Sequence, residues 1–353
     1  KRIADVTVHS GFTGTIKTLA DMYDKQHTAE HRDVMTVEYA GERISYSYLP
    51  PKNHDELLLK RRNIEFWAQQ TFGQMGRYPE FVAALVVGLL DWSHHIEKTN
   101  KQWADNARAY HRYVSRNDLC LTHALTDQYY DRTKPVGKQE DPDLILHIVG
   151  ETKEGPVVRG LRTLATLAPI SDEVIVYPNR PREPDEHDYA IAFAIPMNTK
   201  GLKILCRDLY AEHADPERQP LTTRFDEVDA ALIFDDVVVP WERVFVYKDP
   251  KLLAGINYIH TWGQYSTMLR LVTKLEAFLG VAQLLTKYAK RNMLPQSQIL
   301  LSSMIQDIEI LRSCIQVGES RGYRAEGGTW APLLSAAYRV HSIEASDRAE
   351  RTM

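Results

Sequence analysis

The chain has 353 residues, of which 44% are hydrophobic and 25% charged, and its formal net charge is −4. A chain of this length and composition is typical of a globular protein with two or three packed subdomains. The slightly acidic balance argues against binding of nucleic acid or an anionic membrane, and the longest apolar run, residues 81–90, has about half the length of a membrane span.

The first part of the sequence carries apolar residues at helical spacing. One helix is expected to begin at Asn53 and to end at Gly76, a good stop signal. The next has Pro79 in its first turn, where helices accept proline, and contains the apolar run, which is expected to be a buried helix. The helices predicted here cover residues 14–28, 53–76, 78–98 and 100–116.

The pattern changes to short β-branched segments near residue 144. Most of them lie too close together for crossover helices, so a mostly antiparallel sheet is expected. The predicted strands are residues 144–149, 157–168, 173–178, 189–196, 202–207 and 230–239.

Helical spacing returns at about residue 258, and helices are predicted over 267–292, 297–322 and 331–352. Helices, then a compact β unit, then long amphipathic helices predict an α+β fold with segregated parts. The expected domains are 1–143 (mainly helical), 144–250 (β) and 251–353 (helix bundle), and the bundle is also a candidate subunit interface.

Several kinds of site are not supported by the sequence. It has no Walker loop and no G-x-G-x-x-G motif, which argues against P-loop and Rossmann nucleotide sites. Cys120 and His123 form a C-x-x-H pair, but a zinc site needs four ligands and no second close pair follows, so no metal is predicted. The other cysteines, Cys206 and Cys314, are distant, and an odd number of separated thiols predicts a reducing cytoplasm.

His123 lies between two leucines in an expected loop after a helix. On spacing alone, a histidine satisfied in the core is favoured over one that shares a phenolic proton. Arg77 either hydrogen-bonds the last carbonyls of the preceding helix, which is favoured, or offers a guanidinium to an anionic ligand. The acidic cluster at 224–229 is predicted to be a solvated turn.

Taken together, several stretches resemble the flavin-dependent 4-hydroxyphenylacetate 3-hydroxylase (oxygenase component) family. This family includes chlorophenol monooxygenases and hydroxylases of tyrosine-derived units. The resemblance runs along nearly the whole chain and is carried by residues 62–81, 121–135, 160–169, 222–249 and 304–312, with "EGGTW" at 326–330.

The resemblance implies an acyl-CoA-dehydrogenase-like fold with a helical N-terminal domain, an antiparallel β-barrel in the middle and a C-terminal helix bundle. Family members are homotetramers that take reduced FAD from a separate NAD(P)H-flavin reductase. With molecular oxygen they form a C4a-hydroperoxyflavin and hydroxylate a phenol ortho to its hydroxyl. The implied substrate is 4-hydroxyphenylacetate, a chlorophenol, or a tyrosine-derived unit that is free or tethered to a carrier protein. Relatives continue past Met353, so the bundle is expected to be incomplete in this sequence.

By the resemblance, His123 corresponds to the histidine that hydrogen-bonds the phenol, and Arg77 to an arginine near both flavin and phenol oxygen, where a cation favours phenolate. Phe81 replaces a frequent tyrosine and implies a more apolar wall. His260 is a second candidate base, and the segment from Pro178–Asn179 to His187 is expected to cover the substrate as a mobile lid. The implied substrate contacts are Arg77, Phe81, His123, Asn179 and His260.

The resemblance also implies flavin contacts after His123 and on the strand that contains "TLAT". Ala165 and Thr166 are expected to face the isoalloxazine edge from that strand. The complete set of implied flavin contacts is Thr126, Arg132, Ala165 and Thr166.

Three other functions are alternatives to a phenol hydroxylase. A dehydratase resembling 4-hydroxybutyryl-CoA dehydratase needs closely placed thiolates for an iron–sulfur cluster, whereas Thr267 stands seven residues after His260. An acyl-CoA dehydrogenase needs a carboxylate over the flavin, and Glu309 and Glu326 are open candidates for it. A non-enzymatic binding protein is the third alternative.

Overall fold

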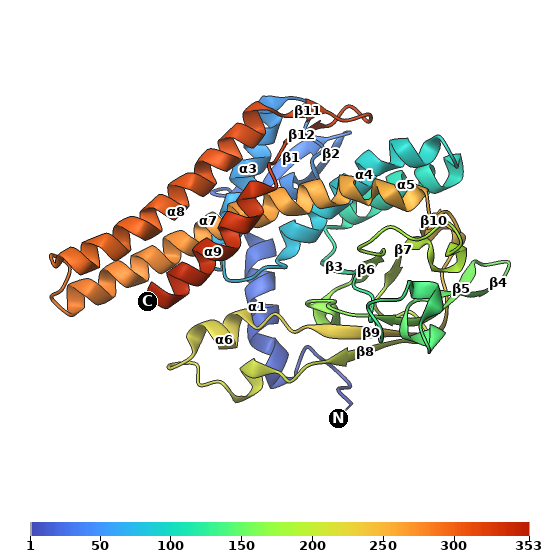
Figure 1. Ribbon diagram of the computed structural model, residues 1–353, viewed down its shortest axis with the longest axis horizontal. Helices are drawn as coiled ribbons and strands as arrows, with labels where there is room; N and C mark the ends of the chain where they lie inside the picture. Colours follow the sequence, from blue (N-terminus) through green and yellow to red (C-terminus); the bar gives the residue numbers. More distant parts are fainter. Residues whose placement is uncertain (1, 353) are drawn as a thin grey trace.

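The computed structural model describes residues 2–352 and has the predicted order of a helical part, a β part and long helices (Figure 1). The α+β class is therefore confirmed. None of the helices in this described range is both long and apolar enough to cross a membrane. The helical part contains α1 (Ser10–Lys25), α2 (Arg32–Met35), β1 (Thr36–Tyr39), β2 (Glu42–Ser45), α3 (His54–Gln69), α4 (Pro79–Glu97) and α5 (Lys101–Asn117).

The β part differs from the expected closed barrel. In residues 2–352 it forms two four-stranded sheets, with strand orders β10-β7-β6-β3 and β4-β5-β9-β8. The sheets share one apolar core, in which Phe193 and Phe234 meet with ring centroids 6.0 Å apart. Their strands are β3 (Leu121–Ala124), β4 (His147–Glu151), β5 (Pro156–Arg162), β6 (Glu173–Val176), β7 (Ile191–Pro196), β8 (Leu202–Cys206), β9 (Ala230–Val238) and β10 (Val244–Tyr247), with α6 (Pro220–Phe225) between β8 and β9.

The pairing is antiparallel, as predicted, except that β3 runs parallel to β6. A parallel pair needs a long connection, and the chain between these two strands includes all of β4 and β5. This pairing matters for the site because β3 carries His123 opposite Ile175.

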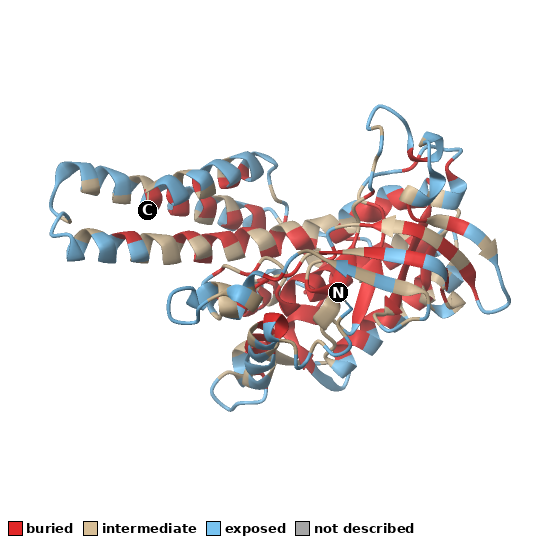
Figure 2. Cartoon of the chain, turned by 90° about the horizontal axis from the view of Figure 1, so that it is seen from below, coloured by how far each residue is buried: buried red, intermediate tan, exposed pale blue. Residues whose placement is uncertain are grey.

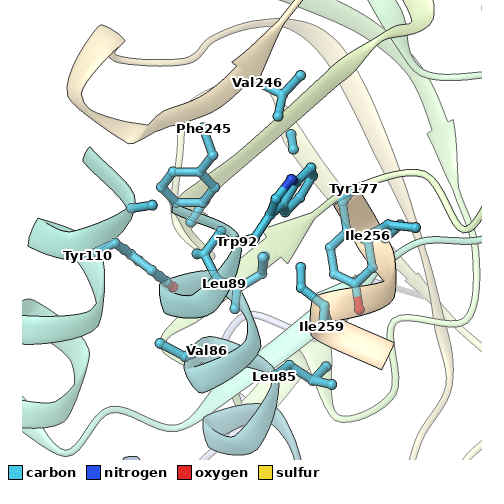
Figure 3. Close-up of a cluster of buried hydrophobic side chains, with 14 of the residues drawn as sticks. Leu85, Val86, Leu89, Trp92, Tyr110, Tyr177, Phe245, Val246, Ile256 and Ile259 are labelled. Atoms are coloured by element: carbon cyan, nitrogen blue, oxygen red, sulfur yellow. The ribbon is translucent and has the colours of Figure 1, made fainter. Parts of the chain in front are cut away.

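Helix α4 is the buried helix expected from the apolar run. Pro79 is in its first turn, and residues 81–89 are buried throughout. Figure 3 shows Leu85 and Leu89 of this helix within a cluster that includes Ile259. A Cβ atom on Gly88 would lie 2.5 Å from the Cα atom of Ile259, so the glycine permits the close crossing of α4 and α7.

The predicted end of the second helix at Gly76 is wrong, because α3 ends at Gln69. Residues 70–76 form a turn in which Gly73 has a φ of 66°, and a Cβ atom there would lie 2.5 Å from the backbone nitrogen of Lys274. The turn therefore packs directly against α7 and fixes where the chain enters α4.

The last part contains α7 (Asn257–Tyr288), α8 (Pro295–Ser320), β11 (Tyr323–Arg324), β12 (Trp330–Ala331) and α9 (Ala337–Thr352). Helix α7 begins ten residues before the predicted start and runs from the core beside α4 to the free end of the bundle (Figure 1). Helix α9 begins later than predicted because Ala331 pairs with Tyr323 in a short hairpin. Figure 2 shows that the far ends of α7 and α8 are largely exposed. The expectation that the bundle is incomplete beyond Met353 concerns a position outside the described residues.

Candidate functional site

A pocket of about 490 Å³ lies where β3, the end of β6, α4, α7 and α9 meet. This volume is in the range of small-molecule sites. The residues implied to contact substrate come from separate parts of the sequence, and all of them line this pocket: Arg77, Phe81, His123, Asn179 and His260. The lining also includes Leu85, Leu125, Tyr177, Gly263, Gln264, Thr267, Met268, Leu271, Tyr338, Arg339 and Ser342.

His123 lies in strand β3 and not in the expected loop, and it is only 4% exposed. Its Nε2 atom is 3.2 Å from Nε of Arg77, and its Nδ1 atom is 3.2 Å from the hydroxyl oxygen of Tyr177. A guanidinium can only donate, so Nε2 accepts and we assign the ring hydrogen to Nδ1, which donates to Tyr177. The neighbours therefore select one tautomer of the imidazole.

Electrostatics keep this imidazole uncharged. Burial, followed by the charges of Arg77 and His260, lowers the pKa of His123 to about 3. The ordinary near-neutral pKa of histidine therefore does not apply at this buried position. A ring with this pKa is neutral at physiological pH and acts as a hydrogen-bond partner.

Arg77 is held at both its backbone and its side chain. Its backbone N–H and that of Gly76 donate to the two carboxylate oxygens of Glu227, at 2.5 Å and 2.6 Å. Its Nη1 donates to the Gly76 carbonyl at 3.0 Å, and its guanidinium carbon is 4.3 Å from the ring centroid of Phe81. The predicted solvated turn at 224–229 thus supplies a carboxylate that holds the site.

Tyr177 is a site residue that the sequence reasoning missed. It follows strand β6 directly, is 1% exposed, and burial raises the pKa of its hydroxyl. The available signal was its position in the predicted strand 173–178, two residues beyond the partner of His123. Phe81 completes this end of the pocket with its ring edge toward His123, at a centroid distance of 5.6 Å.

The expected lid, between β6 and β7, is tied to the segment that follows β3. Asn179 donates its backbone N–H to Leu125 at 3.0 Å, and its side-chain oxygen is buried with no hydrogen-bond partner among the described residues. Arg182 is buried and pairs with Asp127 at 2.9 Å, and the buried Glu186 accepts from the backbone of Gly137. The many charged residues of the segment between β6 and β7 therefore include buried, paired side chains as well as exposed ones.

None of the residues implied to contact flavin lines the pocket, although Thr126 directly follows Leu125, which does. Thr126 follows Leu125 and forms an isolated bridge with Thr163. The expectation that Ala165 and Thr166 lie in a strand is wrong, because β5 ends at Arg162 and these residues form a turn. The N–H of Ala165 donates to Ala230 at 2.9 Å, and the hydroxyl of Thr166 donates to Asp229 at 2.6 Å.

This turn and the segment after β3 have features that fit a flavin. Leu164 has a φ of 61° and is 56% exposed beside Ala165, which leaves an apolar surface for a flat ring. The unpartnered oxygen of Asn179, which lines the pocket, can accept a hydrogen bond from a molecule bound there. Arg132 is exposed, and a guanidinium is a group that can pair with a phosphate.

The alternative enzymes are less well supported by the geometry. Glu309 pairs with Arg312, and Glu326 pairs with Lys98 at 2.7 Å, and neither carboxylate lines the pocket. Thr267 lines the pocket at the position where a dehydratase of this kind would need a cysteine. The described part of the chain, residues 2–352, contains no group of three or more His, Cys, Asp or Glu residues placed to hold a metal ion.

A helical part, paired β-sheets and a helix bundle enclose a pocket of small-molecule size that has an arginine and a neutral histidine at one end. Residues 1–246 match the family described as 4-hydroxyphenylacetate 3-hydroxylase N terminal, and residues 254–353 match its C-terminal counterpart. The chain belongs to the 4-hydroxyphenylacetate 3-hydroxylase family.

Individual relatives agree with this assignment. The 4-hydroxyphenylacetate 3-monooxygenase oxygenase component of Thermus thermophilus is 35% identical over 317 residues, which are 89% of this chain and 65% of the relative. A Streptomyces globisporus monooxygenase named for a 3-chloro-4-hydroxyphenyl substrate on a peptidyl-carrier protein is 31% identical, covering 79% of this chain and 54% of that protein. A crystal structure of a 4-hydroxyphenylacetate 3-monooxygenase oxygenase component with FAD and 4-hydroxyphenylacetate is 32% identical, with a TM-score of 0.92, and covers 100% of this chain and 74% of that one.

Proposed function

We propose that this chain is the oxygenase component of a two-component flavin-dependent monooxygenase that hydroxylates a phenol ortho to its hydroxyl. The observation that carries the proposal is the hydrogen-bonded set of Arg77, His123 and Tyr177 at one end of the pocket, beside the apolar side chains of Phe81 and Leu85. The co-substrates are reduced FAD and molecular oxygen, and a separate NAD(P)H-flavin reductase supplies the reduced FAD. Together, bound reduced FAD and oxygen provide the oxygen atom that is added to the ring.

Arg77 and His123 have the catalytic roles in this proposal. Their mutual contact is 3.2 Å, which is a direct hydrogen bond, so the two side chains separate when a phenol oxygen takes the place of that contact. The neutral Nε2 then accepts the phenolic hydrogen, and the guanidinium donates to the phenol oxygen. Both contacts increase the negative charge on that oxygen, which makes the ortho carbon more reactive toward an electrophilic oxygen. Phe81 and Leu85 provide the apolar wall beside the ring.

The remaining site roles are proposed from position. Asn179 contacts the substrate from the β6–β7 loop, and His260 contacts it from α7, where burial and the charge of Arg339 lower its pKa. The part of the substrate away from the phenol meets Gln264 and Arg339, which favours a polar or anionic para substituent. The flavin contacts Thr126 and Arg132, with Ala165 and Thr166 in the adjacent turn.

The proposal extends to assembly and location. A homotetramer is supported by the apolar side chains exposed on the far halves of α7 and α8, among them Leu284, Leu285 and Ile299. A reducing cytoplasm is supported by three unpaired cysteines. A free phenol and a carrier-tethered phenol both agree with a pocket whose far side is formed by polar residues of α7 and α9.

The function is tested with purified protein, a supplied flavin reductase, NADH, FAD and oxygen. The panel contains 4-hydroxyphenylacetate, tyrosine, a chlorophenol and a tyrosyl unit on a carrier protein, and catechol product is measured. We expect one of these to be hydroxylated, and His123→Ala to lower the rate by about 100-fold or more, which is the usual range for a group that handles a proton.

Two further variants serve as a control and as a comparison for His123→Ala. His54→Ala changes an exposed histidine of α3 and should leave the rate unchanged. Tyr177→Phe should lower the rate less than His123→Ala, because it removes only the partner that orients the imidazole. Parent-level hydroxylation by folded His123→Ala protein would show that the assigned role is wrong.

A further inference from the structure

A second and larger pocket, of about 760 Å³, lies between α4, α5, the β1–β2 turn and the turn between β11 and β12. It shares no lining residue with the pocket that contains His123. The proposed monooxygenase reaction therefore does not account for it.

The charge of this pocket is one-sided. Lys52, Arg108, Arg112 and Arg324 line it, and no aspartate or glutamate does. Arg108 is neutralised by Glu97 and Asp105, whereas the other three cations take part in no ion pair within residues 2–352. Three uncompensated positive charges thus converge on one cavity in a chain whose net charge is −4.

The histidines of the pocket add little charge near neutral pH. Burial lowers the pKa of His111 to about 4, and its Nε2 atom is 2.9 Å from the carbonyl oxygen of Tyr48. Burial and the neighbouring Arg108 also lower the pKa of His94. The positive charge therefore comes from the lysine and the arginines and does not depend on pH near neutrality.

The same pocket has an apolar wall, and the space beside one of its glycines is empty. Tyr39, Pro50 and Leu90 line it, and the half-buried ring of Tyr39 meets His111 edge-on at a centroid distance of 6.2 Å. Gly328, in the β11–β12 turn, has a φ of 88° and no atom within 4 Å of where a Cβ would stand. The pocket thus combines cations for an oligophosphate with a wall for a flat ring.

We propose that this pocket, lined by Lys52, Arg112 and Arg324 and by Tyr39, binds a nucleoside di- or triphosphate. The guanidinium groups form paired hydrogen bonds to phosphate oxygens, and Lys52 contributes a point charge. The base lies against Tyr39. Three cations match the charge of an oligophosphate, whereas a single carboxylate would leave two of them without a partner.

The test is calorimetric titration of the whole chain with ATP and, separately, with inorganic triphosphate, at low salt and with saturating FAD present. FAD is included because its own adenylate half resembles the probe, so ATP bound in the flavin site would be displaced. The double variant Arg112→Gln/Arg324→Gln should weaken ATP binding at least tenfold. The matched control Arg62→Gln/Arg321→Gln removes the same charge from exposed positions outside the pocket and should change the dissociation constant less than twofold.

Tyr39→Ala should weaken ATP binding and leave triphosphate binding unchanged. Three results would overturn the proposal: no saturable binding of ATP by the parent chain, loss of ATP binding when FAD is present, or an equal loss in the pocket variant and its control. Triphosphate binding as tight as ATP binding, with no effect of Tyr39→Ala, would also overturn it, because the base would then make no contact.

Discussion

At the scale of single residues, the position of Arg77 depends on a carboxylate that never faces the pocket. Glu227 accepts two backbone N–H groups at the entrance of α4, and burial raises the pKa of its carboxyl while those two hydrogen bonds oppose the rise. A hydrogen bond to a charged group contributes roughly 1.5–3 kcal/mol. Glu227 is therefore a positioning residue, acting on the substrate through Arg77.

Glu227→Gln places an amide NH₂ against one of the two backbone donors and breaks that hydrogen bond. We expect a loss of about 2 kcal/mol in the free energy of unfolding, measured by urea denaturation. Hydroxylation should slow, mainly through kcat, because Arg77 no longer meets the phenol oxygen correctly. Glu217→Gln, at an exposed position, is the control. A variant that loses stability but keeps the kcat of the parent would reduce Glu227 to a structural role.

The neutral state of His123 predicts how stability depends on pH. Its pKa is about 3 in the folded chain, below the ordinary value of 6.5. As pH falls below 6.5, this histidine becomes protonated in the unfolded chain but stays neutral in the folded chain. Its contribution to the free energy of unfolding is therefore fully present above pH 6.5 and is lost as the pH falls toward 3. His111, with a pKa of about 4, acts in the same direction.

His123→Gln removes one of these groups, so its free energy of unfolding should fall less steeply between pH 7 and pH 5 than that of the parent. Urea denaturation at several pH values in that range measures the slope. His54→Gln, at an exposed position, should keep the parent slope. Identical slopes for the parent and His123→Gln would mean that His123 is accessible to water.

At the scale of elements, the site depends on the crossing of α4 and α7. Phe81 and Leu85 enter the pocket from α4, while His260 and Thr267 enter it from α7. Gly88 sets the distance between the helices, because its missing Cβ leaves room for the backbone of α7.

Gly88→Ala should destabilise the fold by about 1–3 kcal/mol, the usual cost of overpacking, and should disturb the pocket. Gly280→Ala is the matched control on α7, with no atom within 4 Å of the added Cβ. It should stabilise the helix by up to about 1 kcal/mol, because alanine is the better helix former. Thermal unfolding of both variants measures the contrast, and equal shifts would contradict the proposed close packing.

The same elements show what could be predicted from the sequence. The long helices were found because their apolar spacing persists over several turns, and the α+β class followed from their order. Strand β3 was missed because it has four residues and pairs with β6 far along the chain. The turn after Arg162 is predicted as strand because its threonines have high β propensity, whereas the backbone takes positive φ at Leu164 and Leu167.

The candidate site was predictable only in part, for a similar reason. A resemblance identified residues that line one pocket, but their partners arise from contacts between distant segments. Glu227 is 150 residues from Arg77, and Tyr177 is 54 residues from His123. The pKa of His123 also follows from burial, which periodicity cannot supply for an isolated residue.

At the scale of the whole molecule, the far end of the bundle is largely exposed (Figure 2), and it carries an apolar stripe that nothing in residues 2–352 covers. The side chains at 281, 284, 285 and 288 recur at helical spacing on one face of α7 and are 48% to 83% exposed. On α8, Ile299 is 68% exposed. Contiguous exposed apolar surface of this kind marks an interaction site, which supports the proposed homotetramer.

Leu285→Glu should therefore weaken self-association, because assembly would bury an unpaired charge. Its effect on the unfolding of a single chain should stay within about 0.5 kcal/mol, since the side chain is already exposed there. Sedimentation velocity across a range of concentrations measures the assembly. Gln283→Glu adds the same charge to α7 at an exposed position off the stripe and should leave the assembly unchanged. If both variants sediment like the parent, the stripe is not the contact between subunits.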